Sequence, residues 1–271
     1  MSAESGDGSG YHSGQTGPEP CAFPNGTTSP FSPAGLPALV LQRGNNRQPV
    51  FLAPDDYLHY LDSLRMAARE HDLAIHAYGL RPNHIHLVAT PRGPDSLSLT
   101  MQAIGRRYAR YFNRTAGRTG TLWEGRFRSA VFDPAEWMLP AMLYVEGNAV
   151  RAGETVTPEA DRWSSYRHHV GIEASALVSD HSAYWELGNT PFERQSNYQS
   201  LSNEGLSGRT LAVLRKHAHS GCRLAATDSW RNSSGKVRGA SSRCQRAGPS
   251  ANRRRSHPKR QCRRRNRGIC F

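Results

Sequence analysis

The body of this sequence lacks cysteine. All five cysteines lie outside residues 22–221, their number is odd, and their spacing matches no zinc motif: Cys21, Cys222, Cys244, Cys262 and Cys270. This distribution argues against a disulfide framework and indicates a reducing compartment.

Long apolar runs are also missing. No run approaches the roughly 18 residues that a membrane-spanning helix needs. The N-terminus is polar and rich in glycine and serine, whereas a secretory signal begins with a basic segment followed by an apolar one. We therefore expect a soluble, cytoplasmic protein.

Acidic residues are absent from residues 231–271, which carry 14 lysines and arginines. The other 230 residues hold 21 basic and 22 acidic groups, so the formal net charge of +13 belongs to this tail. The tail has almost no apolar residues, and residues 1–35 are dense in Gly, Ser, Pro and Thr. Neither segment can bury enough surface to offset the entropy of ordering, so we expect both to be disordered.

Between these tails, strand and helix patterns alternate. Strands are predicted at 36–43, 73–80, 84–91 and 127–133, and helices at 54–71, 96–113 and from Pro134 to about Val150, where Asp133 is the expected N-cap. The short "RPN" link predicts an antiparallel hairpin. This order predicts an α+β, ferredoxin-like fold, an antiparallel sheet with helices packed on one face.

Two histidines, His84 and His86, are one residue apart in the strand at 84–91. Successive side chains of a strand alternate, so both share one face. Two imidazoles on one strand can bind a divalent cation if a third ligand comes from elsewhere. The alternative is a pair of polar residues that merely face solvent.

The segment "MLYVEGNAV" offers a nucleophile and a third ligand. Tyr144 and Asn148 are four residues apart and should be neighbours on one helical face. The alternative is a core tyrosine and an asparagine that caps the helix.

Residues 101–130 carry seven arginines against the single acid Glu124. A basic patch suits a phosphate backbone, although a solvated helix face has the same composition. Within it "RRYARYFNR" interleaves tyrosines with cations, which favours stacking on unpaired bases, with core packing as the alternative for the tyrosines. The predicted DNA-binding residues are Arg106, Arg107, Tyr108, Arg110, Tyr111, Arg114, Arg126 and Arg128.

Five motifs occur in an order that resembles a known family: "HAYGLRPNHIHLVATP", "MQAIGRRYARYFNR", "GTLWEGRFRS", "YVEGNAVRAG" and "WSSYRHH". They are similar to motifs of the REP-associated tyrosine transposases, which belong to the HUH group of single-strand nucleases. The resemblance covers roughly residues 36–230. It implies a catalytic domain at 36–171, followed by a helical extension at 172–230.

The resemblance also implies a mechanism. His84, His86 and Asn148 would bind Mg²⁺ or Mn²⁺, and Tyr144 would attack single-stranded or hairpin DNA to form a 5′-phosphotyrosine that is later rejoined. The active unit would be a monomer or a homodimer. The alternative is a decayed or domesticated relative that binds DNA without cutting it, which differs in metal binding and covalent capture.

Overall fold

The computed structural model describes residues 32–221, 223 and 224. Both predicted disordered segments lie outside these residues, apart from residues 32–35. Within that short piece the Gly35 N–H donates to the Pro91 carbonyl at 2.7 Å.

A four-stranded antiparallel sheet forms the centre of the domain. Its strands are β1 (Ala38–Arg43), β2 (Leu73–Arg81), β3 (His84–Pro91) and β4 (Arg128–Val131), in the order β2-β3-β1-β4. Together with α1 (Pro54–Glu70) and α2 (Ser96–Thr115) they give a β-α-β-β-α-β chain order. That order and strand arrangement are ferredoxin-like, so the predicted α+β class and antiparallel sheet are confirmed.

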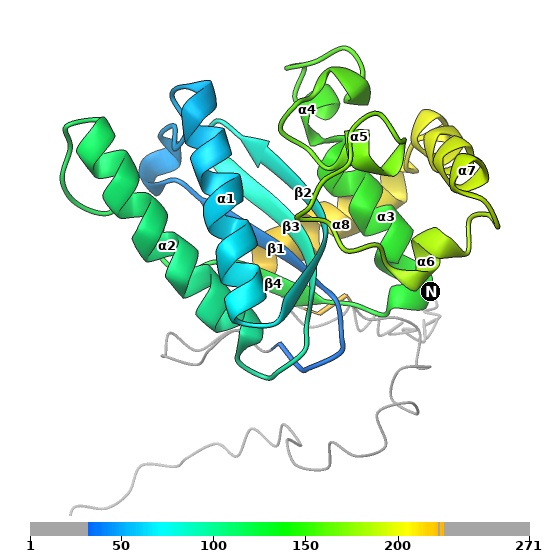
Figure 1. Ribbon diagram of the computed structural model, residues 1–271, viewed down its shortest axis with the longest axis horizontal. Helices are drawn as coiled ribbons and strands as arrows, with labels where there is room; N and C mark the ends of the chain where they lie inside the picture. The colour runs from blue at the N-terminus through cyan, green and yellow to red at the C-terminus, as the bar shows by residue number, and fades with distance from the viewer. Residues whose placement is uncertain (1–31, 222, 225–271) are drawn as a thin grey trace, which may run out of the picture. The chain divides into compact units, whose positions relative to one another are not determined.

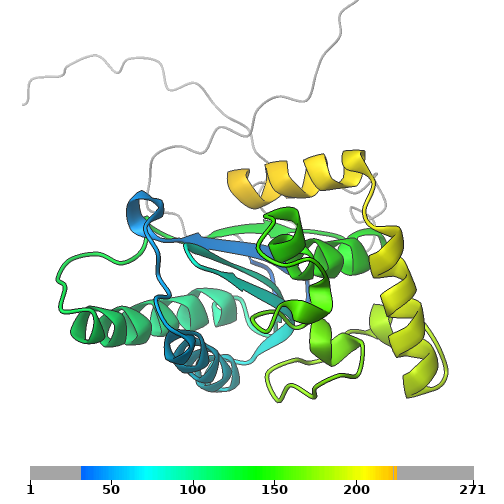
Figure 2. The ribbon, with the colours of Figure 1, turned by 90° about the horizontal axis from the view of Figure 1, so that it is seen from above.

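The sheet is covered by helices on both faces, which corrects the prediction of one covered face (Figures 1 and 2). Helices α1 and α2 pack on Val40, Leu87 and the other side chains of one face. Helix α3 (Pro134–Glu146) packs on Leu39, Val88 and their neighbours on the opposite face. The second layer arises because Met138, Ala141, Met142 and Val145 give α3 an apolar side that must be buried.

Helix α3 begins where the sequence predicts. The Asp133 carboxylate accepts a hydrogen bond from the Ala135 N–H at 3.0 Å, and Pro134 takes the first helical position. Pro140 lies inside the helix without ending it. The helix ends at Gly147, and the short α4 (Asn148–Arg151) continues from there, so the predicted helix is divided in two.

The C-terminal part of the described chain is helical. It contains α5 (Tyr166–His169), α6 (Ser182–Trp185), α7 (Pro191–Glu204) and α8 (Gly208–Ser220), with short 3₁₀ turns at Asn45–Arg47 and Pro158–Ala160 elsewhere in the chain. Helix α8 packs against β4, β1 and α3, so the predicted extension shares the core of the sheet domain. No described helix is both long and apolar enough to cross a bilayer.

A buried ion pair holds the loop after α4 to the end of β2. Arg81 Nη2 donates to both carboxylate oxygens of Asp161, at 2.7 and 2.6 Å, and both residues are 3% exposed. Arg81 Nη1 also donates to Glu154 at 2.7 Å. Because both charges are removed from water, each depends on the other for compensation.

We predict that Asp161→Ala lowers the free energy of unfolding by about 3–5 kcal/mol, because it leaves the Arg81 guanidinium buried with only one carboxylate. Urea denaturation measures this change. Asp62→Ala is the matched control, since it breaks an exposed pair with Arg65 that contributes about 0.2–1 kcal/mol. Equal, small losses in both variants would contradict the assigned role of the buried pair.

Candidate functional site

The two histidines of β3 face α3. Ile85 and Leu87 point into the core beneath α1 and α2, so strand alternation turns His84 and His86 to the other face. His86 is 3% exposed and His84 is partly exposed. Their ring centroids are 5.2 Å apart.

His84 presents a lone pair to the site. Its Nδ1–H donates to Asn83 Oδ1 at 2.7 Å, which leaves Nε2 without a hydrogen. Nε2 lies 3.0 Å from Asn148 Nδ2. Burial, and secondarily the charge of Arg43, lowers the pKa of His84 to about 4. The ring is therefore neutral at physiological pH, as a metal ligand must be.

His86 is the second histidine of the pair, and burial lowers its pKa as it does that of His84. Burial and the nearby His84 hold its pKa well below the usual value. Its Nδ1 is buried and has no hydrogen-bond partner. Two imidazole nitrogens, with an amide oxygen if the Asn148 side chain turns, make a mixed nitrogen and oxygen donor set that fits a divalent cation.

Tyr144 lies beside this pair. Its ring centroid is 5.6 Å from that of His86, and the residue is 6% exposed. The Arg151 guanidinium lies over the ring, 4.6 Å from the centroid, and donates to the Tyr144 carbonyl. Burial raises the pKa of Tyr144, while the positive charges of Arg151 and Arg215 act in the opposite direction. The structure thus brings Tyr144, His84, His86 and Asn148 together.

Gly79 allows α3 to approach the histidines. It pairs with His86 across the sheet, and a Cβ atom at Gly79 would lie 2.7 Å from the carbonyl oxygen of Val145. Only glycine admits this backbone contact. The glycine in "HAYGLRPN" therefore sets the distance between α3 and the histidine pair.

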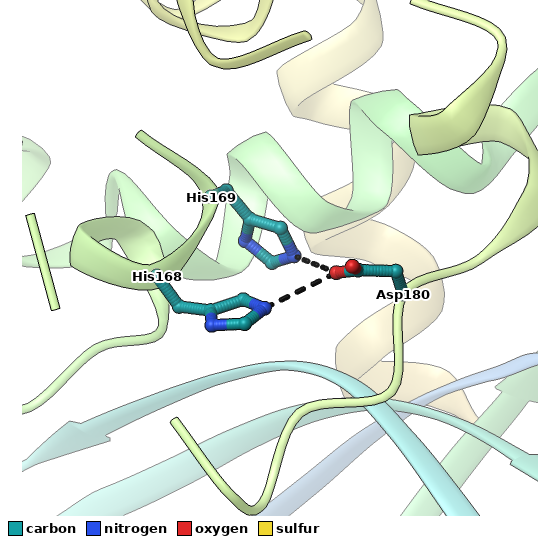
Figure 3. Close-up of side chains that lie close together, drawn as sticks. All are labelled: His168, His169 and Asp180. Atoms are coloured by element: carbon teal, nitrogen blue, oxygen red, sulfur yellow. Dashed lines mark hydrogen bonds and ion pairs between the residues drawn. The ribbon is translucent and has the colours of Figure 1, made fainter. Parts of the chain in front are cut away.

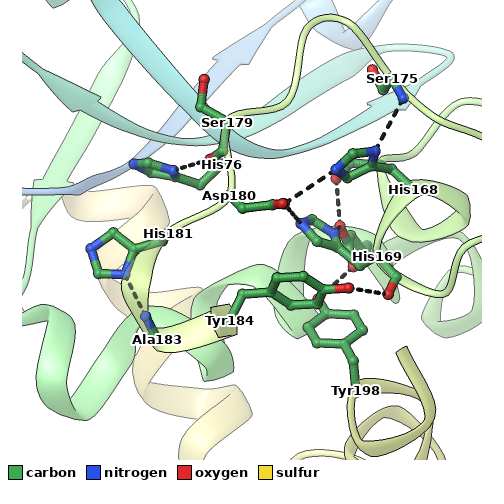
Figure 4. Close-up of polar contacts among 12 residues, drawn as sticks. His76, His168, His169, Ser175, Ser179, Asp180, His181, Ala183, Tyr184 and Tyr198 are labelled. Carbon is green, nitrogen blue, oxygen red and sulfur yellow. Dashed lines mark hydrogen bonds and ion pairs between the residues drawn. The ribbon is translucent and has the colours of Figure 1, made fainter. Parts of the chain in front are cut away.

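Glu146 fixes the end of α3 through buried hydrogen bonds to the C-terminal helices. Its carboxylate is fully buried and accepts hydrogen bonds from Ser165 Oγ–H, His169 Nδ1–H and the Tyr198 hydroxyl (the His169 and Tyr198 side chains are seen in Figure 4). These donors come from α5, the residue before it, and α7. A buried carboxylate needs such donors, so the C-terminal helices hold the turn of α3 that carries Tyr144.

A second group of side chains, His168, His169 and Asp180, has spacing compatible with a metal (Figure 3). Here the Ser175 N–H donates to His168 Nδ1, so Nε2 carries the hydrogen and donates to Asp180 Oδ1 at 3.2 Å. His168 Nε2 thus offers a hydrogen rather than a lone pair. This group forms a hydrogen-bond network, and His84 with Asn148 suits a cation better.

The predicted DNA-binding helix lies on the other face of the sheet. Arg106, Arg110 and Arg114 on α2 are exposed, and Arg107 is half-buried. An open pocket of about 610 Å³ between α1 and α2 is lined by Arg106, Arg107 and Arg110. These arginines are therefore separated by the sheet from Tyr144.

The two tyrosines of α2 differ. Tyr108 is fully buried and its hydroxyl donates to the Val50 carbonyl at 2.6 Å, so its predicted role in stacking on bases is wrong. Tyr111 is partly exposed and stacks on His59, with ring centroids 3.8 Å apart. It stays a candidate for base stacking.

The last two predicted DNA contacts precede or begin β4. Arg126 is exposed in the loop before the strand. Arg128 is exposed on the face of the histidine pair and donates to the His219 carbonyl at the end of α8. Of the predicted arginines on the described elements, Arg128 alone lies on a strand beside the candidate site.

The fold and site define a ferredoxin-like α+β domain in which a histidine pair on the sheet faces a tyrosine on a helix. Residues 39–147 match the family model described as "Transposase IS200 like". This segment contains the sheet, the histidine pair and Tyr144. This part of the chain is therefore similar to the IS200-like transposases, as the sequence motifs indicate.

Two solved structures are similar to this one. A REP-associated tyrosine transposase bound to a REP hairpin is 19% identical, covers 58% of this chain and 96% of its own, and gives a TM-score of 0.46. A putative transposase from Deinococcus radiodurans R1 is 20% identical, covers 43% of this chain and 89% of its own, and gives a TM-score of 0.32. No curated protein matches the sequence.

Sequence reasoning missed three arginines and one histidine around the site: Arg43, Arg151, Arg215 and His219. Arg151 had a signal, because it follows Tyr144 by seven residues and so lies on the same helical face. Nothing in the sequence indicated that Arg215 and His219, on α8, would reach the sheet.

We predict that Gly79→Ala lowers the free energy of unfolding by about 1–3 kcal/mol, because the added methyl group overlaps the Val145 carbonyl. Chemical denaturation measures the loss. Gly208→Ala is the control, since its Cβ atom meets nothing within 4 Å and its stability should be unchanged or slightly raised. Full stability in Gly79→Ala would show that α3 does not depend on this contact.

Proposed function

We propose that this protein cuts and rejoins one strand of DNA through a covalent bond between Tyr144 and a 5′-phosphate. The convergence of Tyr144 with His84, His86 and Asn148 on one face of the sheet supports this proposal most directly. Hairpin-forming single-stranded DNA is the proposed substrate, as the sequence resemblance implies. The predicted cytoplasmic location suits a protein that acts on DNA.

The proposed step is a transesterification. The Tyr144 oxygen forms a bond to phosphorus and loses its proton, the bond from phosphorus to the 3′ oxygen breaks, and the 3′ oxygen takes up a proton. Reversal by a 3′-hydroxyl rejoins strands and needs no ATP, because the phosphotyrosine keeps the phosphodiester bond energy.

The residues around Tyr144 have defined parts in this step. His84, His86 and Asn148 would hold the divalent cation, Mg²⁺ or Mn²⁺, which when bound withdraws charge from a phosphate. Arg151 packs on the Tyr144 ring, where its positive charge favours the phenolate. Gly79 and Glu146 hold the helix that carries the nucleophile.

We predict that Tyr144→Phe abolishes a covalent protein–DNA adduct that the unaltered protein forms in Mg²⁺ or Mn²⁺. A hairpin oligonucleotide with single-stranded flanks is incubated with each protein and resolved on a denaturing gel. Because the bond is to the 5′-phosphate, a 3′ label should stay with the protein and a 5′ label should leave.

Tyr111→Phe is the control for this experiment, since it removes a tyrosine hydroxyl from the opposite face of the sheet. It should keep the adduct. An adduct that survives in Tyr144→Phe would refute the assignment of the nucleophile. DNA binding without any adduct in folded, unaltered protein would favour the non-catalytic DNA-binding relative.

We predict that His84→Ala and His86→Ala each weaken Mn²⁺ binding at least about tenfold, because each removes one ligand of a three-ligand set. Isothermal titration calorimetry with Mn²⁺ alone gives the affinity. His59→Ala is the control, because His59 stacks on Tyr111 beneath the other face. Equal affinities in all three variants would rule out the histidine pair as the metal site.

A further inference from the structure

Helix α8 carries a set of basic side chains to the face of the sheet that holds the histidine pair. It lies beyond residues 39–147, the part that matches the transposase family. It packs across β4 and β1 and against α3, on the same side of the sheet as α3 (Figure 2). Side chains on its inner flank therefore border the candidate site.

His219, near the end of α8, is held by two arginines of the sheet. Arg43 Nη2 donates to His219 Nδ1 at 3.0 Å, so Nδ1 is the acceptor and Nε2 carries the hydrogen. Arg128 donates to the His219 carbonyl. β1, β4 and α8 thus bring two guanidinium groups and one imidazole N–H donor together.

Arg215 extends this cluster towards the nucleophile. It precedes His219 by four residues, so the two side chains are neighbours on one side of α8. Its positive charge acts on Tyr144, as does that of Arg151, which lies over the Tyr144 ring. The cations therefore run from the β1–β4 side of the site to the tyrosine.

These cations have no acidic partners within the part of the chain that the structure describes. Among the described residues, none of Arg43, Arg128, Arg151 and Arg215 forms an ion pair with a carboxylate, whereas Arg81 is paired twice. Like charges gathered without counterions raise the free energy of a fold. A ligand with several regularly spaced negative charges would relieve that cost, and a nucleic-acid backbone carries one per nucleotide.

We propose that Arg43, Arg151, Arg215 and His219 form a phosphodiester-binding track that holds the single strand on either side of the phosphate attacked by Tyr144. The inference rests on the proposed function and extends it. The track binds the phosphate backbone of the DNA and not its bases, so its contacts do not depend on the DNA sequence. It also gives α8 a function in addition to packing.

The test measures DNA binding without chemistry. Arg215→Ala and its neighbour Lys216→Ala are each made in the full chain on the Tyr144→Phe background, with EDTA present. Lys216 is exposed on the same helix and loses the same charge, so it controls for net charge and for effects on α8. Fluorescence anisotropy with a labelled hairpin oligonucleotide that has single-stranded flanks gives the affinity between 50 and 300 mM KCl, roughly the range over which counterion release is resolved.

We expect Arg215→Ala to weaken binding about five- to tenfold and to lower the slope of log affinity against log salt by about 0.7, the value for one lost phosphate contact on a single strand. Lys216→Ala should leave the slope unchanged. Arg43→Ala should repeat the Arg215→Ala result. Circular dichroism melting checks that every variant is folded.

The same slope in Arg215→Ala, Arg43→Ala and Lys216→Ala would overturn the track. This result is distinguishable from failure of the proposed chemistry, because binding is measured without metal or nucleophile. If the unaltered protein formed no covalent adduct while Arg215→Ala still lowered the salt slope, the chemistry would be wrong and the track would stand.

Discussion

The arrangement of this site depends on one buried carboxylate, that of Glu146. It cannot be buried without donors, and its three donors come from α5, the residue before it, and α7. Their hydrogen bonds fix the rotation of the last turn of α3. Tyr144, two residues earlier on α3, lies beside His86, with ring centroids 5.6 Å apart. Gly79 sets the distance between α3 and the sheet. The rotation of α3 and the distance of Tyr144 from the sheet are therefore both determined.

The two faces of the sheet have different roles for a topological reason. Helices α1 and α2 each connect parallel strands, and such crossovers are right-handed, which places both on one face. Helix α3 follows the last strand and is free of that rule. Successive side chains of β3 alternate between the two faces of the sheet. Ile85 and Leu87 therefore lie in the core beneath α1 and α2, and the histidine pair lies on the other face. The arginines of α2 and the candidate site are consequently on opposite sides.

Much of this was predictable from local patterns. Strand alternation placed the histidine pair on one face, and helical spacing placed Tyr144 near Asn148. The interleaved "RRYARYFNR" pattern misled for Tyr108, because core aromatics and base-stacking aromatics have the same spacing on a helix. The covered second face and the approach of α8 were not predictable from local patterns, since they depend on contacts between distant segments, such as Gly79 with Val145 and Arg43 with His219.

The most direct test of the central claim is to locate the covalent bond. Trypsin should release residues 129–151 as one peptide, because arginines precede and end it, and Tyr144 is its one tyrosine. After reaction with a hairpin oligonucleotide in Mn²⁺ and nuclease trimming, mass spectrometry should find a nucleotide phosphate on this peptide. The same mass on the peptides that contain Tyr108 or Tyr111, or on none, would contradict the assignment of Tyr144 as the nucleophile beside His84 and His86.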